Sequence, residues 1–237
     1  MTLQSVFAFC CIVSIQFVSY SQLNEAIEEY KGENWVAAKE KFQFLLDSSY
    51  STEADFYLGM VNTQLENYAQ GQFHFERILK FMPNNINIIK NAELAHSFVN
   101  GNDQWSHPYP MITRLILKIP LLGWIILAIT FSLLLSITLY FIIGRKKSNY
   151  KLHVLLLATT LIISVGCLIH SDSHYSKNQY VFTFDNIQTY ASIEGVETDI
   201  KLEKGRRYKL LEQNNDWIRI AFNNNFYWIP ALNIGIY

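Results

Sequence analysis

Two long apolar runs occupy the middle of the chain. The first covers residues 119–143 and the second residues 152–169, and neither contains Asp, Glu, Lys or Arg. Since a helix rises about 1.5 Å per residue, roughly 20 apolar residues cross the hydrocarbon layer of a bilayer. Core helices of this length in soluble proteins normally carry a polar stripe, which these runs lack. The pattern therefore predicts two transmembrane helices, with a pair of buried core helices as the alternative.

A short basic loop between the runs sets their expected orientation. Its four basic residues are Arg145, Lys146, Lys147 and Lys151. Loops rich in Lys and Arg stay in the cytoplasm. Arg114 and Lys118, before the first run, oppose this preference more weakly. We therefore expect both polar flanks of the hairpin to lie outside the cytoplasm.

The N-terminus predicts a cleaved signal peptide. Residues 6–18 are apolar but short for a membrane span, and Ser19-Tyr20-Ser21 has the small-x-small pattern that a signal peptidase recognises. An uncleaved anchor is the alternative, because no Lys or Arg precedes the apolar stretch. Cleavage after Ser21 would leave Cys167, inside the second run, as the one cysteine, so no disulfide framework is expected.

Residues 22–100 show helical periodicity, with breaks at residues 32–34, 48–52 and 83–85, and contain a repeat. One unit extends from about Thr52 to Asn85. Its landmarks match the tetratricopeptide pattern, with small residues where two helices cross and a Pro after the second helix: Leu58, Gly59, Leu65, Tyr68, Gly71, Phe75, Ile78 and Pro83. A degenerate earlier copy places Ala26, Gly32, Trp35, Ala38, Phe42 and Leu45 at equivalent positions. A third helix at residues 86–99 would cap the stack, and an unrelated small helical bundle is the alternative.

Stacked helix pairs of this type form a concave groove lined by the first helix of each pair. In the better-matched unit the expected groove positions are Glu53, Phe56, Met60, Thr63 and Gln64. This mixed, partly apolar surface suits an amphipathic or extended protein segment. The alternative is that Phe56 and Met60 only contact the neighbouring repeat.

From residue 179 onward the apolar positions alternate with a period of two. Short strands are predicted at residues 180–184, 207–211, 217–221 and 226–229. Turn residues separate them at Gly205, Asn214-Asn215 and Asn223-Asn224-Asn225. Several short strands with tight turns in so short a segment predict a small β-barrel.

This segment resembles a bacterial SH3-like domain. The resemblance rests on Gly205, then Trp217-Ile218-Arg219-Ile220, then Trp228-Ile229-Pro230, with Tyr227 where that pattern has Gly. Such domains bind cell-wall peptides or partner proteins. The aromatic residues that could form a binding face are Tyr190, Trp217, Tyr227 and Trp228, and the alternative is that most of them fill the core. Asn233 stands where the eukaryotic peptide groove has Tyr, so binding of proline-rich peptides is not expected.

Composition narrows the range of functions. The formal net charge is −1, and acids outnumber bases in residues 22–103, which argues against nucleic acid as a partner. The sequence has no glycine-rich phosphate loop, nucleophile elbow or Cys-x-x-Cys motif, so we expect neither an enzyme nor a cofactor. His170 and His174 would share a helix face, but no third ligand is evident, so no metal site is expected.

The order of these segments resembles the BatE family of the bacterial Bat aerotolerance system. The helix following the repeats, with Asn-Ala-Glu-Leu-Ala at residues 91–95, adds to the likeness. The fold class is a multidomain membrane protein with an all-α tetratricopeptide segment, a two-helix transmembrane hairpin and a small all-β SH3-like barrel. The expected segments are a signal peptide (1–21), repeats (22–100), a linker (101–118), a first span (119–143), a cytoplasmic loop (144–151), a second span (152–170), a linker (171–178) and the SH3-like domain (179–237).

The resemblance implies a non-enzymatic scaffold in the bacterial cytoplasmic membrane, with both terminal domains periplasmic. The implied partners, besides the lipid bilayer, are Bat proteins with von Willebrand A domains, alongside a MoxR-type ATPase. The implied process is tolerance of oxidative stress. The alternative function is an envelope sensor whose terminal domain binds cell-wall peptide.

Overall fold

The structure is a computed structural model that describes residues 21–101, 103–145, 151–177, 179–193 and 195–237. The predicted signal peptide, up to residue 20, and Lys146 and Lys147 of the basic loop lie outside the described residues. The chain forms two compact units. One unit combines the residues up to Pro108 with Gln179–Tyr237, and the other is Tyr109–Asn178.

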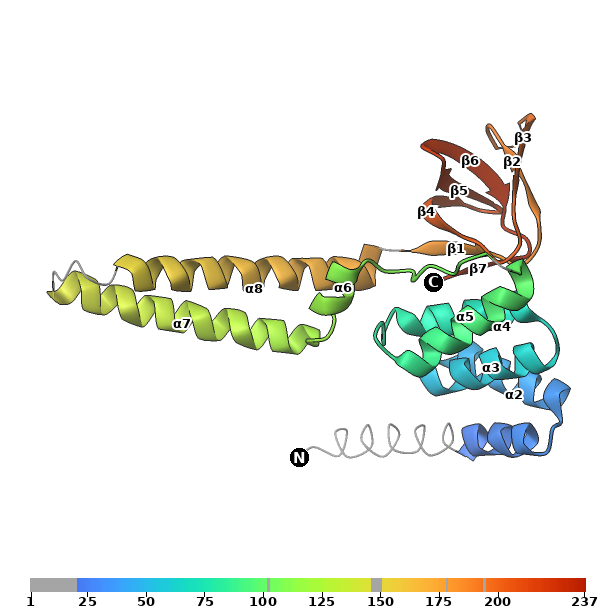
Figure 1. The fold of residues 1–237 in the computed structure, drawn as a ribbon, viewed down its shortest axis with the longest axis horizontal. Coiled ribbons are helices and arrows are strands. Elements are labelled where there is room, and N and C mark those ends of the chain that lie inside the picture. Colours follow the sequence, from blue (N-terminus) through green and yellow to red (C-terminus); the bar gives the residue numbers. More distant parts are fainter. Residues whose placement is uncertain (1–20, 102, 146–150, 178, 194) are drawn as a thin grey trace, which may run out of the picture. The chain divides into compact units, whose positions relative to one another are not determined.

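The first unit starts with a series of helices, coloured blue to green in Figure 1. A helix at residues 21–31 precedes α2 (Trp35–Ser48), α3 (Thr52–Gln64), α4 (Tyr68–Leu79) and α5 (Ile86–Asn100). These bounds agree with the predicted helical segment, its three breaks and its capping helix. An additional short turn at residues 65–67 separates α3 from α4.

The two turns at corresponding places in the repeat have the same geometry. Glu33 and Glu66 both have a φ of 60°. The next residue in each turn donates its backbone N–H to the carbonyl five residues earlier, Asn34 to Glu29 at 3.0 Å and Asn67 to Asn62 at 2.8 Å. This is the hydrogen bond that closes a helix in a Schellman motif. The degenerate first copy therefore keeps the turn of the second copy even where its other landmarks differ.

Glycine allows α3 and α4 to pack closely. A Cβ atom at Gly59 would lie 2.7 Å from Cε1 of Phe75, and one at Gly71 would lie 2.7 Å from Oγ1 of Thr63. Both distances are too short for a real side chain, so the predicted requirement for small residues at this crossing is confirmed. The neighbouring apolar core is formed by Ala26, Ala38, Phe42, Leu45, Ala54, Leu58 and Val61.

The C-terminal segment is an antiparallel seven-stranded sheet with the order β3-β2-β6-β5-β4-β1-β7. Its strands are β1 (Tyr180–Thr183), β2 (Ile187–Tyr190), β3 (Glu197–Leu202), β4 (Arg207–Asn214), β5 (Trp217–Phe222), β6 (Asn225–Pro230) and β7 (Ile234–Ile236). The four predicted strands correspond to β1, β4, β5 and β6. The turn between β5 and β6 has two residues with positive φ, Asn223 (50°) and Asn224 (61°), as a tight hairpin with right-handed strand twist requires.

The sheet and the helices share a core, which differs from the separate modules that the sequence pattern predicts. Ala69 and Phe73 of α4 form one buried cluster with Phe182 of β1 and the C-terminal Tyr237. The ring centroid of Phe73 lies 5.9 Å from that of Phe182 and 5.7 Å from that of Tyr237. Helix α4 is consequently enclosed by its helical neighbours and by the sheet, and most of its residues are buried.

The second unit contains α6 (Met111–Ile116), α7 (Leu121–Arg145) and α8 (Lys151–Lys177). Figure 1 shows α7 and α8 running alongside each other. Leu121–Ile142 and His153–His174 are long and apolar enough to cross a membrane. The two predicted linkers are partly helical, because α6 lies within residues 101–118 and α8 continues through residues 171–177.

Hydroxyl groups inside these two helices bond to the preceding turn of their own helix. Thr130 Oγ1 donates to the carbonyl of Ile126 at 2.8 Å, and Ser164 Oγ donates to that of Thr160 at 2.8 Å. Such internal bonds satisfy polar groups where water is absent.

Candidate functional site

One buried carboxylate ties the helices to the sheet. Glu76 of α4 is fully buried. Its Oε1 accepts hydrogen bonds from Gln72 Nε2 (2.8 Å), Trp105 Nε1 (2.8 Å) and Arg207 Nη1 (3.0 Å), and its Oε2 accepts one from the Tyr237 hydroxyl (2.7 Å). The donors come from α4, from the segment after α5, from β4 and from the C-terminus. We call Glu76 and its four donors the junction network.

The charge on Arg207 is maintained by this network. Burial alone would lower the pKa of Arg207, but the negative charge of Glu76 and its hydrogen bond outweigh that effect and raise the pKa above its usual value. A buried ion pair is stable only when its remaining polar atoms are also bonded. The bonds from Gln72, Trp105 and Tyr237 meet that requirement for the carboxylate.

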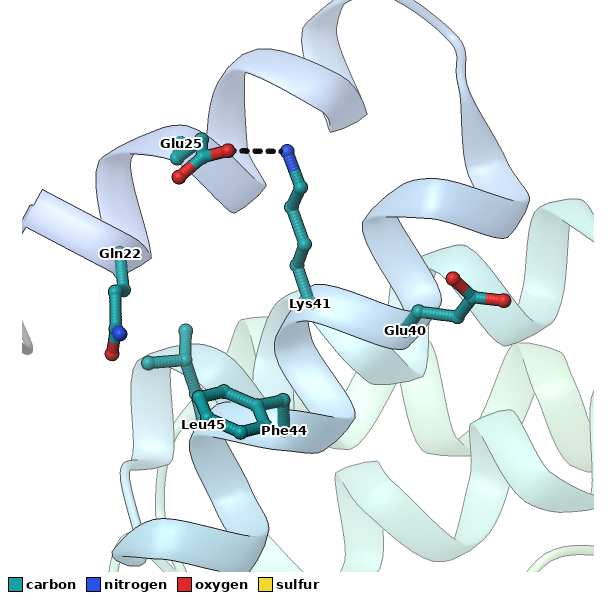
Figure 2. Close-up of a pocket in the computed structure, with 6 residues that line it drawn as sticks. All are labelled: Gln22, Glu25, Glu40, Lys41, Phe44 and Leu45. Carbon is teal, nitrogen blue, oxygen red and sulfur yellow. Dashed lines mark hydrogen bonds and ion pairs between the residues drawn. The ribbon is translucent and has the colours of Figure 1, made fainter.

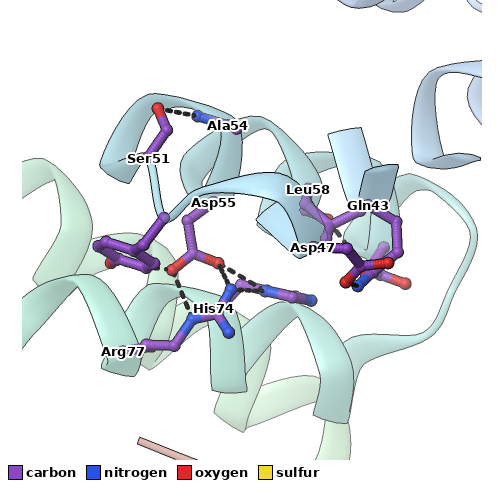
Figure 3. A network of polar contacts seen from close by, with 10 residues as sticks. Gln43, Asp47, Ser51, Ala54, Asp55, Leu58, His74 and Arg77 are labelled. Carbon is purple, nitrogen blue, oxygen red and sulfur yellow. Dashed lines mark hydrogen bonds and ion pairs between the residues drawn. The ribbon is translucent and has the colours of Figure 1, made fainter. Parts of the chain in front are cut away.

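A second buried carboxylate, Asp55 of α3, joins α3 to α4 (Figure 3). Arg77 donates to both carboxylate oxygens, with Nε lying 2.7 Å from Oδ2, and His74 Nδ1 lies 2.7 Å from Oδ1. The Tyr50 hydroxyl completes the group at 3.1 Å from Oδ2. Burial opposes the negative charge, but the hydrogen bonds from His74 and Arg77 outweigh it and hold the pKa of Asp55 below its usual value of 3.8.

His74 stays neutral beside this carboxylate. Burial disfavours the charged imidazole ring and lowers the pKa of His74 below its usual value of 6.5, despite the opposing effect of Asp55. Arg77 already supplies the positive charge that balances Asp55. The Nδ1 atom therefore carries the proton that is donated to Asp55, and Nε2 is a hydrogen-bond acceptor.

A polar hollow of about 260 Å³ lies next to the Asp55 group. Helices α2, α3 and α4 supply seven lining residues, and three more follow β1 or belong to β7. The lining residues are Lys39, Gln43, Asn62, Gln70, Phe73, His74, Arg77, Phe184, Ile234 and Gly235. We call this space the junction hollow.

A second hollow of about 270 Å³ lies between the helix at residues 21–31 and α2 (Figure 2). Lys41 spans its rim, with Nζ 2.7 Å from Glu25 Oε1 and 2.7 Å from Glu29 Oε1. Phe44 and Leu45 form an apolar side of this space. Because Lys41 is bonded to two acids, it offers no unbalanced positive charge to an anionic ligand.

The five predicted groove positions all lie on α3. Glu53 and Gln64 are exposed, whereas Phe56, Met60 and Thr63 are partly buried. The Phe56 ring contacts the ring of Phe75, with centroids 6.0 Å apart, and Thr63 Oγ1 donates to the carbonyl of Gly59 at 2.9 Å. None of the five lines either hollow.

The structure separates the four aromatic candidates of the sheet into two groups. Tyr227 belongs to the core of the sheet. Tyr190, Trp217 and Trp228 are partly exposed at outward-facing strand positions. The rings of Tyr190 and Trp217 meet edge to face at 5.1 Å, and Tyr190 pairs with Trp228 across β2 and β6. We call these three residues the outer aromatic face.

Arg219 extends the outer aromatic face across β5. Its guanidinium carbon lies 5.9 Å from the ring centroid of Trp228 and 5.2 Å from that of Phe226. Side chains at Trp228 and Arg219 are cross-strand neighbours in the register of β5 and β6. The face therefore combines flat aromatic surface with a guanidinium group, which also pairs with Glu212 at 3.7 Å.

The junction network was not predicted from the sequence, although one signal pointed to it. Gln72 and Glu76 are four residues apart and share a helix face, which would normally be read as solvated. Six other residues of α4 are apolar or small and buried: Ala69, Gly71, Phe73, Phe75, Ile78 and Leu79. A helix that must be enclosed, yet carries an acid, requires a buried partner.

Metal ligation has no support in the described part of the chain, where no group of three or more His, Cys, Asp or Glu could hold an ion. His170 Nε2 lies 3.0 Å from the hydroxyl of Thr113, and the ring of His174 packs edge to face on that of Tyr109 at 4.6 Å.

Compared with protein-family models, with curated proteins and with solved structures, the chain gives no match.

Proposed function

We propose that this protein is a non-enzymatic, membrane-anchored scaffold that presents a helical-repeat module and an SH3-like module together on the outer side of a bacterial cytoplasmic membrane. The observation that carries the proposal is the junction network. It joins residues before the apolar hairpin (Glu76 and Trp105) to residues after it (Arg207 and Tyr237). Two flanks that share a buried core must lie on the same side of any membrane that the hairpin enters.

The exposure of the two long helices favours lipid as their surroundings. In the apolar stretch of Leu121–Ile142, 0% is buried within the protein. In the apolar stretch of His153–His174, 11% is buried within the protein. Core helices of a soluble protein would be mostly buried. Helix α7 ends at Arg145 and α8 begins at Lys151, so basic residues stand at the connection that the positive-inside rule assigns to the cytoplasm.

The matching turns at Glu33 and Glu66 and the close glycine crossing support a tetratricopeptide-like repeat. The meander of β4, β5 and β6 supports an SH3-like assignment, since it carries the Trp217 and Trp228 strands of that pattern. Both modules leave a surface open. The exposed positions of α3 and the outer aromatic face are two surfaces that the described residues offer to partners.

The proposed partners are those that the resemblance to BatE implies. They are membrane proteins with von Willebrand A domains, acting with a MoxR-type ATPase in tolerance of oxidative stress. The scaffold itself needs no cofactor for this role.

Co-purification of the full chain with a tagged von Willebrand A-domain Bat protein, from detergent-solubilised membranes, tests this proposal. The combined variant Glu53→Lys and Gln64→Lys changes the exposed face of α3, and Glu66→Lys is a matched control at the turn. The proposal predicts that the double variant loses recovery of the partner while the control keeps it. Recovery that is absent for the unchanged chain, or equal for all three proteins, would contradict it.

A second function, binding of cell-wall peptide, is favoured by the outer aromatic face. Partly exposed aromatic rings such as that of Trp228 are suited to stacking against flat wall components. Sedimentation of the full chain in nanodiscs with purified cell wall tests it. Co-sedimentation that Trp228→Ala abolishes would support this function over a purely protein-binding role, and absence of co-sedimentation would exclude it.

A further inference from the structure

We propose that the junction hollow binds a small carboxylate that also carries a hydrogen-bond donor next to it, such as an α-hydroxy acid or an α-amino acid. The site is independent of the two partner surfaces, because its lining contains neither the exposed positions of α3 nor the outer aromatic face.

The charged residues that line the junction hollow are positive. Lys39 and Arg77 line it, and no Asp or Glu is among its lining residues. The charge of Arg77 is balanced by Asp55 behind it, whereas Lys39 Nζ bonds to a neutral acceptor, Gln70 Oε1, at 3.2 Å. Lys39 therefore brings an unbalanced positive charge, which favours an anionic group such as a carboxylate.

The hollow also offers acceptors that need a donor. Asn62 is 1% exposed, and its Nδ2 donates to the carbonyl of Leu58 at 2.9 Å. Its Oδ1 has no hydrogen-bond partner although it is buried and Asn62 lines the hollow. A buried acceptor without a partner costs about 1–3 kcal/mol, so a ligand hydroxyl or ammonium group would be favoured there.

His74, which also lines the hollow, adds a second acceptor. Its Nδ1 is committed to Asp55 at 2.7 Å, which leaves Nε2 with a lone pair. The hollow thus holds an unbalanced cation, Lys39, and two acceptors, on Asn62 and His74, within a small space. This combination matches a ligand whose negative group and hydrogen-bond donor are a few bonds apart. A plain anion would satisfy Lys39 but leave Asn62 Oδ1 unbonded.

Size and shape limit the ligand to a small molecule. The volume of about 260 Å³ is below the roughly 300–1,000 Å³ of sites for drug-sized ligands. Phe73, Phe184 and Ile234 form apolar walls. A side chain at Gly235 would collide with the ring of Phe73, so the backbone of β7 closes one side of the space. A short aliphatic part of the ligand would lie against these walls.

Saturation-transfer NMR on the full chain in nanodiscs of zwitterionic lipid tests the proposal with four probes. Lactate and alanine carry a carboxylate and a donor, propionate has the same carbon chain without the donor, and inorganic phosphate is an anion of different shape. We expect lactate or alanine to bind with a Kd of about 1–10 mM, as suits so few atoms, and propionate and phosphate to bind at least about tenfold more weakly, the loss of about 1.4 kcal/mol.

Variants locate the site. Asn62→Leu, which removes the unbonded acceptor at similar volume, should abolish the preference for lactate or alanine over propionate. Lys39→Met should weaken all three carboxylates. Lys41→Met, on the same helix but facing the other hollow, should change none of them. Thermal unfolding shows whether Asn62→Leu folds. If it does not, the comparison of Lys39→Met with Lys41→Met still decides whether the carboxylates bind in the junction hollow. Equal binding of propionate, stronger binding of phosphate, equal effects of the two lysine variants, or no binding of any probe would overturn the proposal.

Discussion

Glu76 and Arg207 are 131 positions apart in the sequence, yet their side chains form a buried ion pair of 3.0 Å. The whole apolar hairpin lies between them in the chain. Their contact therefore requires the chain to leave the first unit, pass through both long helices and return to the same place. This relationship links the topology of the membrane segment to the stability of the outer unit.

Glu76→Gln should destabilise the first unit strongly. The substitution keeps the size of the side chain but leaves Arg207 buried without its counter-charge, which typically costs about 3–5 kcal/mol. Thermal unfolding of the full chain in nanodiscs, followed by tryptophan fluorescence, measures the effect. Trp105 is a local reporter because its Nε1 bonds to Glu76.

Glu25→Gln is the control for Glu76→Gln. Its ion pair with Lys41 is largely exposed, and exposed pairs contribute roughly 0–1 kcal/mol. A loss of stability for Glu76→Gln no larger than that for Glu25→Gln would mean that the junction network does not hold the unit together.

Acid should weaken the first unit in two stages. The pKa of His74 is lowered from 6.5 in the folded state, so the unfolded chain binds a proton first and stability falls as the pH drops below about 6.5. The pKa of Asp55 is lowered from 3.8, so the stability it contributes is present above that pH and is lost as the pH falls through the lowered pKa.

His74→Gln should flatten the pH dependence of the unfolding midpoint below about pH 6.5, because the lowered pKa of His74 contributes to that slope. Asp47→Asn, an exposed acid of α2, should leave the dependence unchanged. His96, whose pKa is also lowered mainly by burial, should account for a residual slope. An unaltered slope in His74→Gln would show that the pKa of His74 is the same in the folded and the unfolded chain, contrary to the effect expected of its burial.

Gly59→Ala should separate α3 from α4. The added Cβ would lie 2.7 Å from the ring of Phe75, and such overpacking costs about 1–3 kcal/mol. Gly166→Ala, in α8, is the control because its Cβ would meet nothing within 4 Å. A fall in the unfolding midpoint is expected for the first variant only, and equal midpoints would contradict the close crossing of the two helices.

Tyr227→Ala and Trp228→Ala test the division of the aromatic residues. Tyr227 is in the core of the sheet, so its truncation should cost about 3–5 kcal/mol. Trp228 is partly exposed on the outer aromatic face, so its loss should cost about 1 kcal/mol and act chiefly on binding. Circular dichroism of thermal unfolding distinguishes the two, and a larger loss for Trp228→Ala would reverse the assignment.

Sequence patterns were most informative where one local rule decides the structure. The apolar runs, the breaks around Gly32 and Pro83, and the Asn223-Asn224 hairpin each follow from helix length or turn chemistry. The strands β2, β3 and β7 were missed. The strands Ile187–Tyr190 and Ile234–Ile236 are too short to show a periodic pattern of apolar residues. The strand Glu197–Leu202 consists mostly of polar or charged residues, so its apolar pattern is weak.

The contact between helices and sheet was beyond local reasoning, because it joins segments separated by the hairpin. Glu76, Arg207 and Tyr237 each look like surface residues in their own segment. Only their long-range pairing makes them a buried group. The same applies to the junction hollow, whose lining comes from α2, α3, α4 and β7.

Labelling of single introduced cysteines tests the central claim most directly. Glu66→Cys places one in the turn after α3, and Val196→Cys places one beside β3, where the side chain is 81% exposed. In intact bacterial spheroplasts, a membrane-impermeant maleimide should modify both positions. If either position stays unmodified until the cells are lysed, the two flanks do not share the outer side of the membrane.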